Sequence, residues 1–151
     1  MPAPTATING QSLSIPGFCG TRDIVGLETP TPMRGPDDFE ADGVAGAEFV
    51  PKVRGSLRTA CSFLVEGRND EVGTPWPDPW VGLRNNLETI AAAIISPTAL
   101  VTCTVTYGDA STRSGQIYVP SVVPSALVDD DGTGGGRILV VEIVCPAGGL
   151  T

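Results

Sequence analysis

A single helical pattern stands in a chain whose other periodic stretches alternate like strands. The stretch PDPWVGLRNNLETIAAAIISPT, residues 77–98, has Asp78 where a helix N-cap is preferred and Pro79 at the first helical position. Ser96-Pro97 ends the pattern, because a residue before proline is disfavoured in the helical conformation. The pattern predicts one helix in a protein otherwise built of strands, and such a helix needs an apolar surface to cover.

One side of the expected helix is apolar. Its large side chains recur three or four positions apart, with Ala91 in the same stripe: Trp80, Leu83, Leu87, Ile90 and Ile94. We expect these side chains to pack the helix against a sheet. Trp76 and Trp80 of PWPDPW are expected to anchor the start of the helix, and the alternative is an aromatic platform for a sugar or peptide.

Strand patterns fill most of the remaining sequence. They cover residues 7–17, 22–28, 52–67, 99–108, 112–130 and 137–149. Asn9-Gly10 predicts a tight turn in the first stretch, and Gly55 a bulge in the third. Pro120 and Pro124 indicate an edge strand or a bend. We expect a mainly β fold, an antiparallel sandwich or open barrel of about six to eight strands with one central α-helix, in a single domain over residues 1–151.

Two segments have no periodicity. Residues 1–7 are expected to form a flexible arm, and residues 29–51 a long loop. The loop combines two aromatic residues with a cluster of acids: Phe39, Phe49, Asp37, Asp38, Glu40 and Asp42. One interpretation is a solvated acidic loop without a partner. A second is that its acids bind a cation or face a basic partner. A third is an assembly loop that orders against a neighbouring subunit, because its two Phe side chains need an apolar surface.

Composition excludes several classes of function. The chain has no His, so catalytic triads and dyads that depend on imidazole are impossible. The four cysteines contain no CxxC pair and lie mostly in apolar runs, so we expect free buried thiols, no metal and no cofactor. A net charge of −8 argues against tight nucleic-acid binding. No apolar run is long enough to span a membrane, and the N-terminus does not resemble a secretory signal.

The order of these features resembles the tail proteins of long-tailed bacteriophages. The resemblance covers nearly the whole chain and is carried by TINGQSLSIPG, by the long loop leading into FVPKVRGSLRTACSFLVEG, by DPWVGLRNNLETIAAAI and by the closing hairpin. The Arg-biased, Gly- and Pro-rich composition suggests a phage of an actinobacterial host. The resemblance implies the tail-tube fold, in which hexameric rings enclose a lumen, the helix braces the ring-forming sheet, and loops and arms contact the next ring.

The resemblance makes the major tail tube subunit our first expectation. Such a subunit is not an enzyme. It stacks as homo-hexameric rings, contacts other phage tail proteins and lets DNA pass without specific binding, in a virion tail assembled in the host cytoplasm. The first alternative is a distal tail adaptor or a tail terminator ring of the same fold. The second is a monomeric β-sandwich that binds a ligand through its tryptophans, and an enzyme with a carboxylate pair is the weakest hypothesis.

Overall fold

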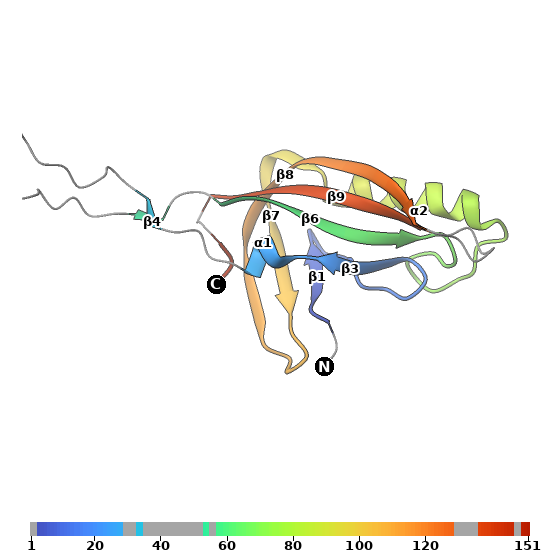
Figure 1. Cartoon of the computed structure of the whole chain (residues 1–151), viewed down its shortest axis with the longest axis horizontal. Coiled ribbons are helices and arrows are strands. Elements are labelled where there is room, and N and C mark those ends of the chain that lie inside the picture. The colour runs from blue at the N-terminus through green and yellow to red at the C-terminus, as the bar shows by residue number, and fades with distance from the viewer. Residues whose placement is uncertain (1–2, 29–32, 35–52, 55–56, 129–135, 147–148) are drawn as a thin grey trace, which may run out of the picture.

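The structure, a computed structural model, describes residues 3–28, 33–34, 53–54, 57–128, 136–146 and 149–151 (Figure 1). Its elements follow in the order β1 (Thr5–Ile8), β2 (Gln11–Ser12), β3 (Cys19–Asp23), α1 (Val25–Glu28), β4 (Met33–Arg34), β5 (Val53–Arg54), β6 (Leu57–Glu66), α2 (Pro79–Ile94), β7 (Ser96–Thr106), β8 (Thr112–Val128) and β9 (Gly136–Cys145).

Seven of the described strands form one antiparallel sheet in the order β2-β1-β7-β8-β9-β6-β3. The sheet folds over on itself along β8, whose first half pairs with β7 and whose second half pairs with β9. In Figure 1, β3, β6 and β9 run across the view, whereas β1, β7 and the first half of β8 run down it. The mainly β, antiparallel fold class predicted from the sequence is confirmed.

The fold-over point coincides with a proline. The register between β8 and β9 shifts between Tyr118 and Ser121, on either side of Pro120, and shifts again after Pro124. Proline cannot donate a ladder hydrogen bond, so it is accommodated where the pairing is interrupted. The predicted bend is therefore confirmed, and the predicted edge position is wrong, because β8 has a neighbour on each side.

The first hairpin follows the predicted turn. Ile8 pairs with Gln11, and the two residues between them, Asn9 and Gly10, both have positive φ (51° and 78°), as a two-residue hairpin turn requires. The flexible arm predicted over residues 1–7 is wrong at its C-terminal end. Thr5–Ile8 form β1, which pairs with β7, because the backbone groups of Thr5 to Thr7 complete the ladder beside that strand.

Two further predictions need correction. Residues 22–28 were expected to form a strand, but β3 ends at Asp23 and residues 25–28 form α1. The Asp23 carboxylate accepts a hydrogen bond from the Val25 backbone N–H, which favours a helical turn over continued pairing. The loop predicted over residues 29–51 contains β4, which pairs with β5. The predicted bulge at Gly55 lies outside the described residues.

The core lies inside the fold of the sheet. β9 alternates as predicted, and β6 alternates in its second half. Their inward-facing side chains are buried: Cys61, Phe63, Val65, Leu139, Val141, Ile143 and Cys145. Leu83, Ile90 and Ile94 of α2 join the same cluster. The helix contacts β6, β8, β9 and β2, so it covers the side of the sheet that the fold-over leaves open. None of the described helices has both the length and the apolar character that a membrane crossing requires.

All four cysteines are free and buried, as predicted. Burial raises the pKa of Cys19, Cys61 and Cys103 to about 12. A thiol with that pKa is about one part in ten thousand thiolate at pH 8, and the thiolate is the reactive form.

We therefore expect the native protein to react very slowly with an aromatic disulfide reagent at pH 8, and all four thiols to react once the chain is unfolded in guanidinium. The absorbance of the released thiolate measures both. Rapid release of one or more equivalents from the native protein would contradict this description of the core.

Candidate assembly surface

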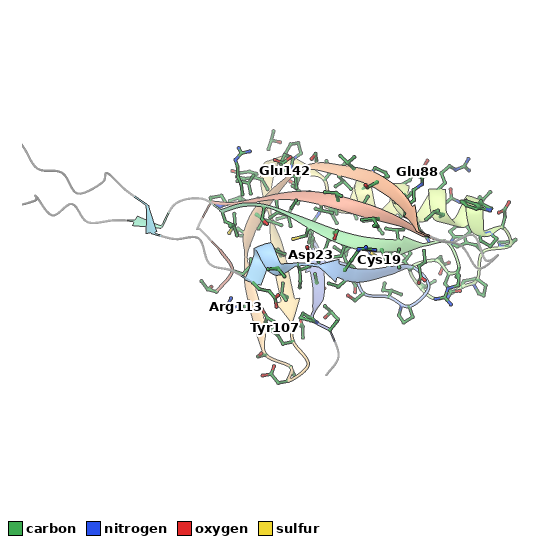
Figure 2. All side chains as sticks on the ribbon, in the orientation of Figure 1. Cys19, Asp23, Glu88, Tyr107, Arg113 and Glu142 are labelled. Atoms are coloured by element: carbon green, nitrogen blue, oxygen red, sulfur yellow. The ribbon has the colours of Figure 1, made fainter. Side chains whose placement is uncertain are left out.

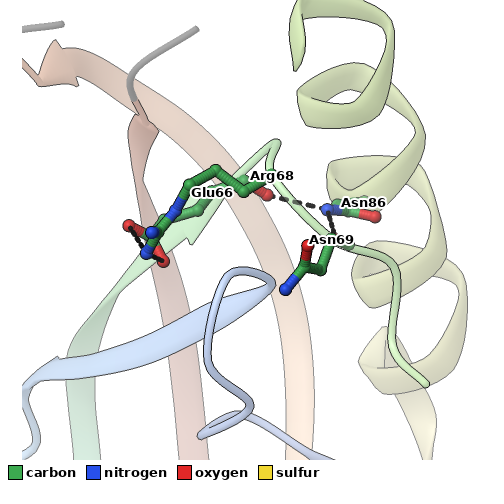
Figure 3. Close-up of polar contacts among 4 residues, drawn as sticks. All are labelled: Glu66, Arg68, Asn69 and Asn86. Carbon is green, nitrogen blue, oxygen red and sulfur yellow. Dashed lines mark hydrogen bonds and ion pairs between the residues drawn. The ribbon is translucent and has the colours of Figure 1, made fainter. Parts of the chain in front are cut away.

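The helix α2 is fixed to the sheet by a buried polar side chain, Asn86. Its side-chain amide nitrogen donates to the backbone carbonyls of Glu66 (2.7 Å) and Asn69 (2.8 Å) (Figure 3). Its amide oxygen accepts from the indole Nε1 of Trp76 at 3.1 Å. Asn86 is 1% exposed, and one side chain thus satisfies three polar groups of the connection between β6 and α2.

Two glycines let the helix approach this connection closely. A Cβ on Gly67 would overlap the Pro79 carbonyl and lie 2.7 Å from the Leu83 nitrogen. A Cβ on Gly82 would lie 2.5 Å from the Gly67 carbonyl oxygen and 2.6 Å from the Trp76 ring. Backbone therefore packs directly on backbone at this point, with the Trp76 ring against the helix. Trp76 anchors the helix, as the sequence indicated.

The start of α2 is capped as predicted. The Asp78 carboxylate accepts from the Trp80 backbone N–H at 2.9 Å, and Pro79 is the first helical residue. The cap fixes where the helix begins, and hence which side chains of the first two turns face the sheet.

The apolar stripe divides into a buried part and an open part. Leu83, Ile90 and Ile94 are buried, and Leu87 is partly buried against the core. Trp80 departs from the prediction, because its side chain is 50% exposed. Helix–sheet packing at the first turn is supplied by Gly82 and Trp76 instead, so Trp80 is left at the edge of the contact.

A groove lies where Trp80 leaves the sheet. It has a volume of about 320 Å³ and runs between α2 and the start of β9, lined by Trp80, Leu83, Arg84, Leu87, Glu88 and Arg137. Its floor is apolar, and its rim carries two guanidinium groups and one carboxylate. In the described part of the chain the ion pairs are Arg58–Glu142 and Arg68–Glu66, so neither Arg84 nor Arg137 has an ionic partner there.

The segment between Glu28 and Leu57 is anchored at the other end of the sheet. The Arg113 guanidinium donates to the Glu28 carbonyl at 2.9 Å. Leu57 pairs with Cys145 at the far end of β6 from α2. Burial raises the pKa of Tyr107, and the nearby Glu28 carboxylate adds to the shift. Figure 2 places Tyr107 and Arg113 together beneath α1, where they hold the base of the segment.

The outer face of β6, β9 and β8 is a second open surface. Glu142 lies at its centre (Figure 2), where it accepts from Ser121 Oγ at 3.1 Å and pairs with Arg58 at 3.7 Å. Around it lie half-buried apolar side chains of β9: Ile138, Val140 and Val144.

The predicted assembly-loop residues lie outside the described residues: Asp37, Asp38, Phe39, Glu40, Asp42 and Phe49. In the part of the chain that is described, no three His, Cys, Asp or Glu side chains lie close enough together to hold a metal ion.

Comparison with known proteins finds similarity among solved structures. No family model and no curated protein sequence matches the chain. Among solved structures, the chain is similar to the SPP1 Dit (gp 19.1) protein, described as a paradigm of the hub adsorption apparatus in phages that infect Gram-positive bacteria. The TM-score is 0.61 at 15% sequence identity, covering 97% of this chain and 51% of that one. The chain thus has the fold of about half of a phage tail hub protein.

Asn86 was missed in the sequence, although a signal was present. Leu83, Asn86 and Ile90 are three and four positions apart, so Asn86 lies on the apolar side of the helix. A polar residue within an apolar stripe, twenty residues after a strand end, indicates a buried hydrogen-bonding role. Nothing in the sequence indicated that Trp80 would be exposed, because the spacing of the stripe is the same for its buried and exposed members.

Replacing Asn86 tests its role. Asn86→Ala leaves the Glu66 and Asn69 carbonyls and the Trp76 N–H without their partner, so we expect a loss of about 2–4 kcal/mol in the free energy of unfolding. Asn85→Ala, one residue away and only half-buried, should change it by less than about 0.5 kcal/mol. Urea denaturation followed by tryptophan fluorescence measures both. Equal effects of the two substitutions would show that Asn86 is not the anchor.

Proposed function

We propose that this chain is a structural protein of a long bacteriophage tail and that it acts as a ring-forming subunit. The observation that supports this most strongly is the match of nearly its whole length to a phage tail hub protein. The folded-over sheet braced by one helix also agrees with the tail-protein resemblance in the sequence. In this proposal the protein is a component of the virion tail, assembles in the host cytoplasm and contacts other tail proteins.

Two positions in the tail fit this fold. Because the match is to a hub protein, it favours the adaptor ring that the sequence left as an alternative. The tube subunit, our first expectation from the sequence, remains the second candidate. It is favoured by the net charge of −8, since an acidic lumen would not retain DNA. In both positions we propose homo-hexameric rings, and stacking of the rings distinguishes them.

Electron microscopy of the purified chain at increasing concentration tests ring formation, with light-scattering mass measured on the same samples. We expect closed rings of uniform diameter, with a mass close to six chains. Rings that remain single support the adaptor position, and rings that stack into tubes support the tube position. A strict monomer at every concentration would count against both.

We propose that the long loop of residues 29–51, called the acidic segment below, is the contact between subunits. Phe39→Ser together with Phe49→Ser should abolish assembly and leave the unfolding free energy within about 0.5 kcal/mol, because the two aromatic rings would contact a neighbour and not their own core. Val72→Ser is the matched control, since Val72 is 80% exposed. Electron microscopy and urea denaturation give the two readouts. Assembly that survives the double substitution would remove this segment from the contact.

The ligand-binding alternative has a specific test. Trp80 is half exposed and Trp76 holds Asn86, so only Trp80 is free to contact a sugar or peptide without loss of the fold. Trp80→Ala should abolish binding to a glycan array if this alternative is correct. Absence of any glycan signal from the unmodified protein would argue against it.

A further inference from the structure

We propose, building on the ring assembly proposed above, that the groove between α2 and β9 binds the acidic segment around Phe39 of a second copy of this chain. The groove is formed by described residues, and the segment that we propose to bind there is chosen for its sequence around Phe39. The groove and the segment are complementary in charge, and the groove of the same chain lies far from the base of the segment.

The groove has the chemistry of a site for an acidic aromatic peptide. Trp80, Leu83 and Leu87 form an apolar floor large enough for one aromatic ring. Arg84 and Arg137 supply two guanidinium groups at the rim, where they can bind carboxylates through paired hydrogen bonds. Arg137 also donates to the Ser125 carbonyl at 3.2 Å, which holds its side chain in place. Glu88 offsets only one of the two positive charges.

The segment carries the complementary groups in a short sequence. In PDDFEAD, Phe39 has acids directly on both sides, Asp38 and Glu40, with Asp37 and Asp42 close by. If the Phe39 side chain occupied the groove, the neighbouring carboxylates would lie beside the two guanidinium groups. Phe49 has a single acid next to it, so it matches the groove less well. Central aromatic anchors with charged residues at the rim are typical of protein contacts.

The groove of the same chain is too far away to be the acceptor. The groove lies at the Val65–Arg137 end of β6, and the segment leaves at the Leu57 end. The nine residue steps of β6 separate these ends by about 30 Å. Figure 1 shows β4 lying farther out still, beyond the Leu57 end. Phe39 is five residues beyond Arg34, the last residue of β4, so a fully extended chain carries it only about 18 Å from this hairpin. The acceptor is therefore the groove of a second copy.

The groove is also held in shape before binding. Asn86, Gly82 and the Asp78 cap fix the first two turns of α2 against the end of β6, and Trp80 and Arg84 project from those turns. A site that needs no rearrangement loses less free energy to ordering when a neighbour binds.

A peptide measures the groove independently of assembly. A fluorescein-labelled peptide of residues 35–50 is titrated with the full-length chain at concentrations where light scattering gives the monomer mass. We expect saturable binding by anisotropy, weakened about tenfold or more by Arg84→Glu, because that change places a carboxylate against carboxylates. Arg22→Glu, the same charge change on exposed β3, should leave the affinity unchanged. A peptide with Phe39→Ser should bind at least tenfold more weakly.

Disulfide trapping measures the contact in assembled protein. The native thiols are buried, so we expect an introduced exposed cysteine to be oxidised selectively. A chain with Asp42→Cys is mixed with a chain carrying Glu88→Cys and oxidised under assembling conditions. We expect a cross-linked product with the mass of two chains. The control pair, Asp42→Cys with Arg22→Cys, should give much less.

The outcomes separate this inference from the ring proposal. Rings that form without a Glu88 cross-link, or with equal cross-linking at Arg22, overturn the groove as acceptor and leave ring formation standing. Peptide binding that depends on Arg84, in a chain that never forms rings, supports the groove and counts against the ring. A peptide that does not bind the unmodified monomer, or that binds the Arg84 and Arg22 variants equally, overturns the inference.

Discussion

The structure depends on the contact between α2 and the end of β6. Asn86 satisfies three polar groups there, and Gly67 and Gly82 allow backbone to approach backbone. A buried amide with every partner present fixes one position of the helix, because any other position would leave polar groups unpaired. The helix then presents Leu83, Ile90 and Ile94 to the core and closes the side that the folded sheet leaves open.

The same contact determines which surfaces remain for other proteins. Because Gly82 and Trp76 fill the space nearest the sheet, Trp80 is displaced to the edge. There it borders the groove with Arg84 and Arg137, neither of which forms an ion pair within the described residues. At the other end of β6, Arg113 and α1 hold the start of the acidic segment. In the proposed contact, the groove between α2 and β9 would bind the acidic segment of the next copy, which is the polarity that a head-to-tail ring requires.

Much of the fold could be predicted from local patterns. The Asp78-Pro79 start, the Asn9-Gly10 turn and the alternation in β9 each depend on neighbouring residues, which a single sequence displays. The failures arise where distant residues decide the outcome. The N-terminal residues became β1 because β7 offered a free edge, and residues 25–28 became α1 because Asp23 caps them. The sequence alone does not show that β7 has a free edge or that the Asp23 side chain turns toward Val25, so the local pattern decided both predictions.

The candidate site could be predicted only in part. The stripe on α2 identified the helix face, but it did not distinguish the buried Leu83 from the exposed Trp80, because the two differ only in what the sheet places opposite them. Pairing of the groove with residues around Phe39 required the position of both ends of β6, which no spacing in the sequence provides. Two chains with 15% sequence identity can share a fold because the pattern of buried positions persists when individual residues change.

Hydrogen exchange of the chain before and after assembly tests the central claim most directly, that a preformed domain joins its neighbours through α2 and the acidic segment. The account predicts that amides of residues 36–50 and of the first two turns of α2 become protected on assembly, while those of β6 and β9 are protected equally in both states. Protection that first develops in β6 and β9 on assembly, with the start of α2 unchanged, would contradict it.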